Sequence, residues 1–182
     1  MNLPDRSVRA VPLPEASRAT RFYPRTDLAD AYAVGLPDGA IDDPEQLARF
    51  ILAQQPPWIG ALLKLRDGLV AGFGLKTVGQ LRQATPASGE RRIDFFRIFE
   101  THPHEILIGE DDSHLDFRLS VMTQAAPGTG GRQVVLSTVV HCHNTLGRAY
   151  IALIAPFHRR IVQASLARAA RTGWPLRERP AA

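Results

Sequence analysis

The amino-acid sequence predicts an α+β domain in which a curved antiparallel sheet grips one long C-terminal helix. Four segments rich in β-branched and aromatic residues follow one another between residues 93 and 143, with only short connections between them. Strands joined by such short connections are antiparallel neighbours in a sheet. Near residue 145 the hydrophobic period lengthens from two to 3.6, and the amphipathic helix that this predicts is able to cover the concave face of the sheet.

Length and composition fit one globular domain. The 182 residues are 45% hydrophobic and 22% charged, which is ordinary usage for such a domain. We expect the domain over residues 26–172, with an extended or disordered arm at 1–25 and a tail at 173–182. No apolar run approaches the ~20 residues of a membrane helix, and no secretory signal is visible near the start. The single cysteine, Cys142, suits a reducing compartment, so we expect a cytoplasmic protein.

The net charge of +4 arises at the two ends of the chain. Residues 1–25 and 158–182 carry half of the 22 basic residues but few of the 18 acidic ones. No aromatic residues alternate with basic ones, as a stacking surface for single-stranded nucleic acid requires. Because basic ends attract phosphate without sequence preference, we expect no specific nucleic-acid partner.

The first predicted elements are a strand and two helices. Residues 28–34 tolerate β-structure and are predicted to form the strand. Asp43 is a candidate helix N-cap and Pro44 suits the first helical position, and apolar residues then recur at helical spacing. A second amphipathic helix is predicted over residues 57–74, followed by a polar loop at 76–90.

Four strands are predicted next, at residues 93–99, 104–110, 114–123 and 133–143. In the third strand apolar and polar residues alternate, so each kind occupies one face. The apolar face carries Leu115, Phe117, Leu119 and Val121, and the polar face carries His114, Asp116, Arg118 and Ser120. The apolar face is the better candidate for the core.

The last helix is predicted over residues 146–171. Placing residues at 100° intervals gives one mostly apolar stripe, which consists of Tyr150, Ile151, Ile154, Phe157, His158, Ile161 and Ser165. The residues predicted to lie opposite this stripe are Arg159, Arg160 and Gln163. Pro156 lies inside the pattern, so we expect a kink or a local break there.

Two segments carry a distinctive pattern: GEDDSHLDFRLSV at residues 109–121 and VVHCHNTLGRAYIALIAPFHRRIVQASLARA at residues 139–169. Both resemble a bacterial family catalogued as domain of unknown function 2867, and LADAYAV and LLKLRDGLVAGFGLKT are similar to its N-terminal landmarks. The resemblance covers roughly residues 10–170. It implies a relationship to the START and polyketide-cyclase-like (SRPBCC) superfamily, whose members bind hydrophobic ligands in a helix-grip cavity.

This layout predicts a ligand cavity between the sheet and the last helix. The candidate lining residues are Phe117, Leu119, Tyr150, Ile154, His158 and Ile161. We expect binding of a hydrophobic or amphipathic small molecule there, without catalysis. Two alternatives stay open. One is an enzyme of the cyclase, dehydratase or hydrolase type that uses a cavity histidine and a carboxylate, and the other is a structural or interaction module, for example a homodimer, with a filled core.

Three polar residues are candidate anchors for such a ligand: Asp116, Arg118 and His143. Asp116 and Arg118 stand two apart on one strand, so their side chains point the same way. On a solvated face, which we favour, they form a weak surface ion pair, whereas in the cavity they anchor a carboxylate or a carbonyl. His158, on the helix stripe, is either a packing residue or a cavity donor or general base.

The sequence predicts no metal site and no cofactor. His102, His104 and Glu110 lack the spacing of a cupin-type ligand set. The acidic segment 110–112 lacks the spacing and the glycine of a calcium loop and is predicted to serve as a turn.

A second histidine cluster lies at the end of the fourth strand. His141 and His143 share a face, but a closed metal site needs about four ligands. Cys142 stands between them and points to the opposite face, so the sequence shows no partner that activates its thiol as a nucleophile.

Overall fold

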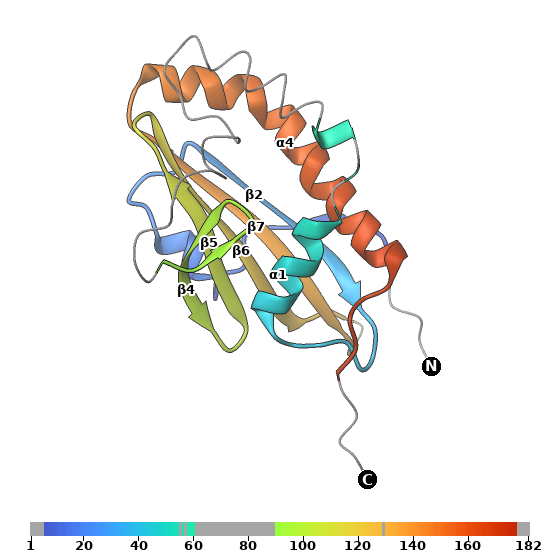
Figure 1. Ribbon diagram of the computed structural model, residues 1–182. Helices are drawn as coiled ribbons and strands as arrows, with labels where there is room; N and C mark the ends of the chain where they lie inside the picture. The colour runs from blue at the N-terminus through green and yellow to red at the C-terminus, as the bar shows by residue number, and fades with distance from the viewer. Residues whose placement is uncertain (1–5, 55, 57, 61–89, 129, 178–182) are drawn as a thin grey trace.

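The computed structural model describes residues 6–54, 56, 58–60, 90–128 and 130–177. Figure 1 shows one twisted sheet with two helices packed on one of its faces. The sheet has seven strands in the order β1-β2-β7-β6-β5-β4-β3, and all neighbours are antiparallel. Their bounds are Arg9–Ala10 (β1), Leu28–Leu36 (β2), Arg92–Ile93 (β3), Phe96–His102 (β4), Glu105–Asp111 (β5), Leu115–Ala125 (β6) and Arg132–Cys142 (β7). The prediction of an antiparallel α+β helix-grip fold is confirmed.

The predicted strand at 93–99 is wrong at its start. The chain turns at Asp94 and Phe95, which separate β3 from β4, and Ile93 pairs with Phe96 across this turn. Asp94 has a φ of 53°, a left-handed conformation that aspartate adopts more readily than β-branched residues do. The apolar residues around the turn all favour strands, so the local pattern concealed it.

Helix α1 (Pro44–Ala53) begins where the sequence predicts. Asp43 Oδ1 accepts hydrogen bonds from the backbone nitrogen of Glu45 at 2.8 Å and of Gln46 at 3.1 Å. These bonds satisfy two of the free N–H groups at the helix start. Residues 58–60 are helical, and the rest of the second helix predicted at 57–74 lies outside the described residues, as does almost all of the loop predicted at 76–90.

Helix α4 (Thr145–Thr172) follows β7 directly. The side chain of Asn144 accepts from the backbone nitrogen of Gly147 at 2.9 Å and caps the helix. Of the kink or local break predicted at Pro156, the break is wrong, because the helix continues through this residue. Figure 1 shows that the helix axis curves along its length instead. No helix in the described part of the chain is long and apolar enough to cross a membrane.

The side of α4 that packs on the sheet is rotated from the predicted stripe. Phe157 is 44% exposed, and Tyr150, Ile154 and Ile161 are half-buried. The buried residues are Gly147, Ala155, Val162, Ser165, Leu166, Ala169 and Ala170. Small residues dominate this set because they let the helix backbone approach the strands closely, and a search for large apolar side chains overlooks them.

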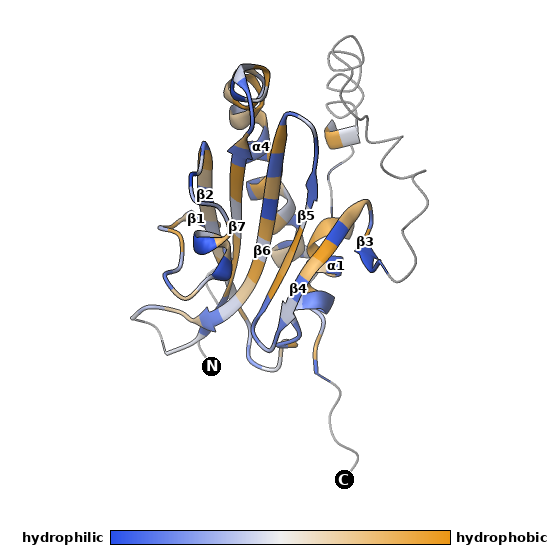
Figure 2. Ribbon diagram, turned by 90° about the vertical axis from the view of Figure 1, so that its left-hand side faces the viewer, coloured by the Kyte–Doolittle hydropathy of each residue, from blue (hydrophilic) through white to orange (hydrophobic). Residues whose placement is uncertain are grey.

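The two faces of the sheet are covered by different parts of the chain, as Figures 1 and 2 show. We call the side under α1 and α4 the helix face, where α4 lies over β2 and β7 and α1 lies over β4, β5 and β6. The opposite side, the arm face, packs against residues 11–23, which include the short 3-10 helix η1 (Arg18–Arg21). The arm predicted to be extended or disordered is therefore laid over the sheet in its described part.

Candidate functional site

Apolar packing between α4 and the sheet is divided into two clusters. The cluster under the C-terminal half of α4 includes Tyr32, Leu136 and Val162. The cluster under the N-terminal half consists of Leu28, Leu115, Val140, Cys142 and Ala155. Phe117 is partly buried and packs against both clusters.

Polar side chains occupy the division between these clusters. Asp30 stands on β2 between Leu28 and Tyr32, and Thr138 stands on β7 between Leu136 and Val140. Asp30 and Thr138 are partners in the β2–β7 register, so both side chains lie on the helix face. The sheet thus presents one carboxylate and one hydroxyl to the middle of α4.

His158 and Arg159 reach this position from α4. His158 Nε2 lies 3.0 Å from Thr138 Oγ1 and 3.6 Å from Asp30 Oδ1. Arg159 Nε lies 3.5 Å from Asp30 Oδ2, so the prediction that Arg159 points away from the sheet is wrong. We call Asp30, Thr138, His158 and Arg159 the Asp30 cluster.

The carboxylate of Asp30 is not fully satisfied by its surroundings. Its side chain is 10% exposed, and in the described structure neither oxygen has a hydrogen-bond partner. Its contacts with His158 and Arg159 exceed the usual length of a hydrogen bond. Since buried carboxylates normally accept hydrogen bonds, the Asp30 carboxylate lacks a donor that the described residues do not supply.

Apolar side chains of α4 on the turns before and after His158 differ in their exposure. Tyr150, Ile154 and Ile161 are half-buried, and Leu153 and Phe157 are 58% and 44% exposed. Of the other predicted lining residues, Leu119 is 7% exposed in the core, and Phe117 and His158 lie between sheet and helix. The structure therefore brings the predicted lining residues to the same side of the sheet.

Arg118 lies on the arm face, so neither placement considered for it is right. It is 3% exposed, because the N-terminal arm covers it. Its guanidinium carbon lies 4.4 Å, 5.5 Å and 3.4 Å from the ring centres of Phe22, Tyr23 and Phe99. One terminal nitrogen is 2.7 Å from Asp111 Oδ1. Arg118 therefore binds the arm rather than solvent or a ligand under α4.

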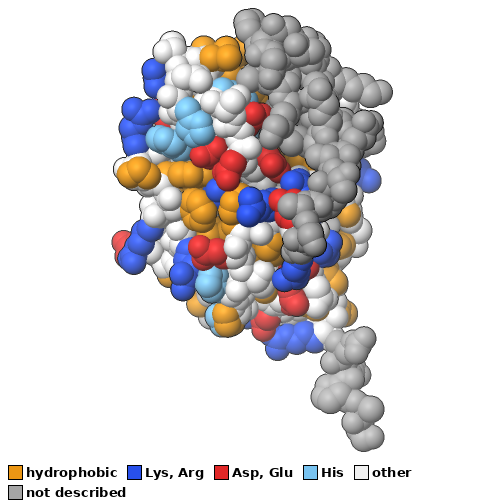
Figure 3. Space-filling model, turned by 60° about the vertical axis from the view of Figure 1, so that its left-hand side comes forward, with side chains coloured by type: hydrophobic (Ala, Val, Ile, Leu, Met, Phe, Trp, Pro, Cys, Tyr) orange, Lys and Arg blue, Asp and Glu red, His pale blue; other side chains and the backbone are white. Residues whose placement is uncertain are grey.

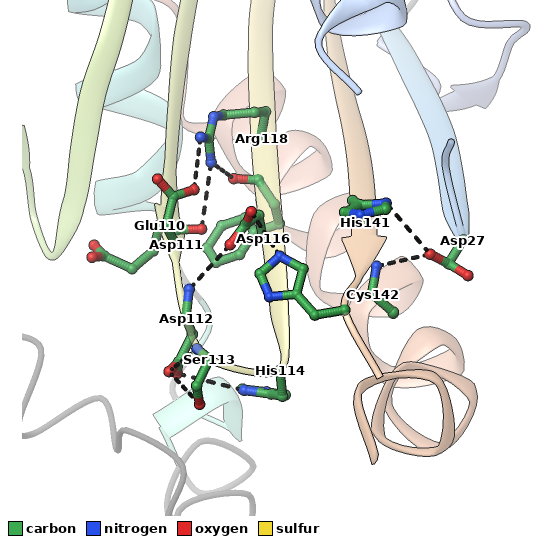
Figure 4. A network of polar contacts seen from close by, with 12 residues as sticks. Asp27, Glu110, Asp111, Asp112, Ser113, His114, Asp116, Arg118, His141 and Cys142 are labelled. Atoms are coloured by element: carbon green, nitrogen blue, oxygen red, sulfur yellow. Dashed lines mark hydrogen bonds and ion pairs between the residues drawn. The ribbon is translucent and has the colours of Figure 1, made fainter. Parts of the chain in front are cut away.

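Asp116 and His143 also lie away from α4 and form a pair of their own. His143 Nε2 is 2.9 Å from Asp116 Oδ2, and this hydrogen bond raises the pKa of His143. Figure 4 shows the surrounding polar network, and Figure 3 shows histidine and acidic side chains gathered beside apolar ones on this side. The predicted proximity of Asp116 and Arg118 does not produce an ion pair, since Arg118 pairs with Asp111.

Cys142 and Asp27 are joined by a backbone hydrogen bond next to this network. Asp27 Oδ2 accepts from the backbone nitrogen of Cys142 at 2.7 Å. Burial acts to raise the pKa of Asp27, but this bond and the charge of Arg25 outweigh it and lower the pKa. Burial raises the pKa of the Cys142 thiol, with Asp27 adding to the effect. A nucleophilic thiolate is therefore disfavoured at this position.

The three residues compared above with a cupin-type set of metal ligands lie in different parts of the β4–β5 hairpin. His102 Nε2 lies 2.8 Å from Glu100, His104 stands in the turn between β4 and β5, and Glu110 lies 3.1 Å from Arg92. Among the described residues, no three His, Cys, Asp or Glu side chains are arranged to hold a metal ion.

Asp30 and Thr138 are the residues that sequence reasoning missed. Asp30 is a carboxylate in a strand whose same-face neighbours, Leu28 and Tyr32, are largely buried. The polar residue at position 30, between two apolar residues on one face of the strand, was visible in the sequence. The sequence did not show that Asp30 contacts His158 on α4, because this contact depends on how the helix lies across the sheet.

Comparison with known proteins places the chain in a family. No curated protein matches it. A family model described as protein of unknown function (DUF2867) matches residues 22–165. This span includes β2, β7 and most of α4, with all four members of the Asp30 cluster. The chain therefore belongs to the DUF2867 family.

Proposed function

We propose that the protein binds a hydrophobic or amphipathic small molecule between α4 and the helix face of the sheet, without catalysing a reaction. The observation that carries this proposal is the Asp30 cluster. Burying a carboxylate without hydrogen bonds costs free energy, and a core that serves packing alone has no need of one. A polar group set among apolar walls is the usual composition of a small-molecule site.

The apolar half of the proposed site is supplied by α4 and β6. Ile154 and Ile161 lie one turn before and just under one turn after His158, on the same flank of the helix. Phe117 contacts the apolar clusters on both sides of Asp30. An aliphatic or aromatic ligand body against these side chains removes apolar surface from water, which supplies the driving force for binding.

The test is a pair of tryptophan substitutions on α4. Ile154→Trp adds bulk on the proposed ligand side, and Ala152→Trp adds the same residue at an exposed position two residues earlier. The probe is N-phenyl-1-naphthylamine, a hydrophobic dye whose fluorescence rises on binding. We expect saturable binding to the wild type and to Ala152→Trp, and at least a 10-fold loss of affinity in Ile154→Trp with little change in Tm.

The alternative of a filled core predicts a different result. Overpacking a solid interface costs about 1–3 kcal/mol, so Ile154→Trp then lowers the Tm while no variant binds the dye. That outcome contradicts ligand binding and favours a structural module.

Acid–base catalysis is a second candidate, because His158 and Asp30 lie 3.6 Å apart. The carboxylate in this arrangement is Asp30 rather than Asp116. Both sheet contacts of His158 are made by Nε2, whereas a catalytic triad uses the two ring nitrogens for different partners. Esters, enones and polyketide-like thioesters are the substrates to screen. If the wild type turns over one of them and the rate falls about 10²–10⁴-fold in His158→Gln or Asp30→Asn, the protein is an enzyme and the proposal of binding alone is wrong.

A further inference from the structure

We infer that the polar end of the ligand is a hydrogen-bond donor, an alcohol or a primary amine, which is received by Asp30, and that a carboxylate end is rejected. This inference rests on the proposed function and specifies the chemical class of its ligand.

Among the described residues, the hydrogen bonding around Asp30 leaves its carboxylate without a donor. Thr138 already lies at hydrogen-bond distance from His158 Nε2, at 3.0 Å. Asp30 Oδ1 lies at 3.6 Å from the same nitrogen, which is longer than a hydrogen bond. Both Asp30 oxygens are buried, and neither has a hydrogen-bond partner in the described structure. The site therefore offers two acceptor atoms and needs a donor.

The charge on the helix face disfavours an anionic ligand. Asp30 is 10% exposed, whereas the nearest arginine, Arg159, is 49% exposed and its charge is screened by water. The deeply buried arginine of β6, Arg118, lies on the opposite face of the sheet under three aromatic rings. A ligand carboxylate placed against α4 therefore meets a buried negative charge that no buried arginine of the described helix face offsets.

The expected preference for a donor over a carboxylate is large enough to measure. A hydrogen bond to a charged acceptor contributes about 1.5–3 kcal/mol, so an alcohol or an amine gains roughly 10-fold or more in affinity from Asp30. A ligand that places a carboxylate at the same point binds more weakly, because its negative charge is repelled by Asp30. The preference is a property of Asp30 alone, whereas affinity for the apolar body of the ligand comes from the side chains around it.

The experiment compares three ligands with the same ten-carbon chain: decan-1-ol, decan-1-amine and decanoate, each below its micellar concentration. Affinity is measured by displacement of N-phenyl-1-naphthylamine at neutral pH. We expect the alcohol and the amine to bind the wild type at least 10-fold more tightly than decanoate. In Asp30→Asn, which preserves shape, the preference of the amine over decanoate falls at least 10-fold while dye binding is retained.

The matched control is Asp116→Asn, which removes a carboxylate from the arm face and is expected to leave all three affinities unchanged. Decanoate binding as tightly as the amine, or an unchanged preference in Asp30→Asn, overturns the inference while dye binding still supports the proposed function. Failure of the wild type to bind the dye and all three ligands overturns the proposed function itself.

Discussion

Each face of the sheet buries a carboxylate, and the two carboxylates differ in the hydrogen bonds that they accept. Glu105, on the arm face, is 4% exposed and accepts hydrogen bonds from the hydroxyls of Ser17 and Ser120, both at 2.6 Å, and from the backbone nitrogen of Arg18 at 3.0 Å. Asp30, on the helix face, has no hydrogen-bond partner in the described structure. A carboxylate whose donors all come from its own chain holds the fold together, whereas the one without donors is the group that we propose receives a ligand.

Arg118 extends the same contrast. It is as buried as Glu105, and the arm contributes to its surroundings through the rings of Phe22 and Tyr23, while the sheet contributes Phe99 and Asp111. The arm face therefore combines apolar packing with buried polar groups whose partners lie within the fold. This distinction between the faces predicts different responses to substitution on each of them.

Removing Arg118 is expected to have the largest effect on stability. Arg118→Ala leaves a cavity beneath Phe22 and Phe99 and removes the cation–π contacts, so we expect a loss of about 2–4 kcal/mol. Urea denaturation followed by circular dichroism measures it. Arg97→Ala is the control, since Arg97 also lies over Phe99, at 4.8 Å, but its side chain is 49% exposed. Equal losses in the two variants contradict a structural role for the buried arginine.

Glu105→Gln is expected to destabilise by about 1–3 kcal/mol. In glutamine only the amide oxygen accepts hydrogen bonds, because the NH2 group is a donor. At least one of the three buried donors, a hydroxyl or the backbone N–H, therefore loses its partner. The same urea denaturation measures the loss, and limited proteolysis detects loosening of residues 11–23. A variant as stable as the wild type shows that the arm is held by its apolar contacts alone.

Asp30→Asn, the equivalent change on the helix face, is expected to alter stability by less than about 1 kcal/mol or to increase it. The reason is that replacing a poorly satisfied buried charge removes a desolvation penalty. Urea denaturation of Asp30→Asn and Glu105→Gln under the same conditions, without ligand, compares the two changes in the free energy of unfolding. A loss as large as that of Glu105→Gln makes Asp30 a structural residue and removes the contrast between the faces.

The smallest effect is expected from the partly exposed pair of His143 and Asp116. Because the pKa of His143 is raised in the folded protein, the pair contributes fully below the unfolded value of about 6.5 and is lost as the pH rises through the folded pKa. The contribution is less than about 1 kcal/mol at a solvated site. Stability curves of wild type and His143→Ala between pH 5.5 and 9 should converge as the pH rises. Curves that diverge over that range contradict the assignment.

Local sequence patterns determined most of the secondary structure. The alternation in residues 114–123, the cap at Asp43 and the helical spacing after residue 145 each depend on a few neighbouring residues, and all three reappear in the structure. Short connections required antiparallel pairing, because a parallel crossover needs more chain. The turn at Asp94 was missed since its flanking residues favour a strand as strongly as those of β4 do.

Only the tertiary structure decided which side chains meet. The alternation in β6 separated Phe117 and Leu119 from Asp116 and Arg118, but it did not show that the arm covers the second pair. The helical pattern placed His158 toward the sheet, and the position of α4 over β2 and β7 placed it beside Asp30 and Thr138. Periodicity is encoded within a few residues, whereas the rotation of a helix and the choice of covering segment follow from close packing between distant parts of the chain.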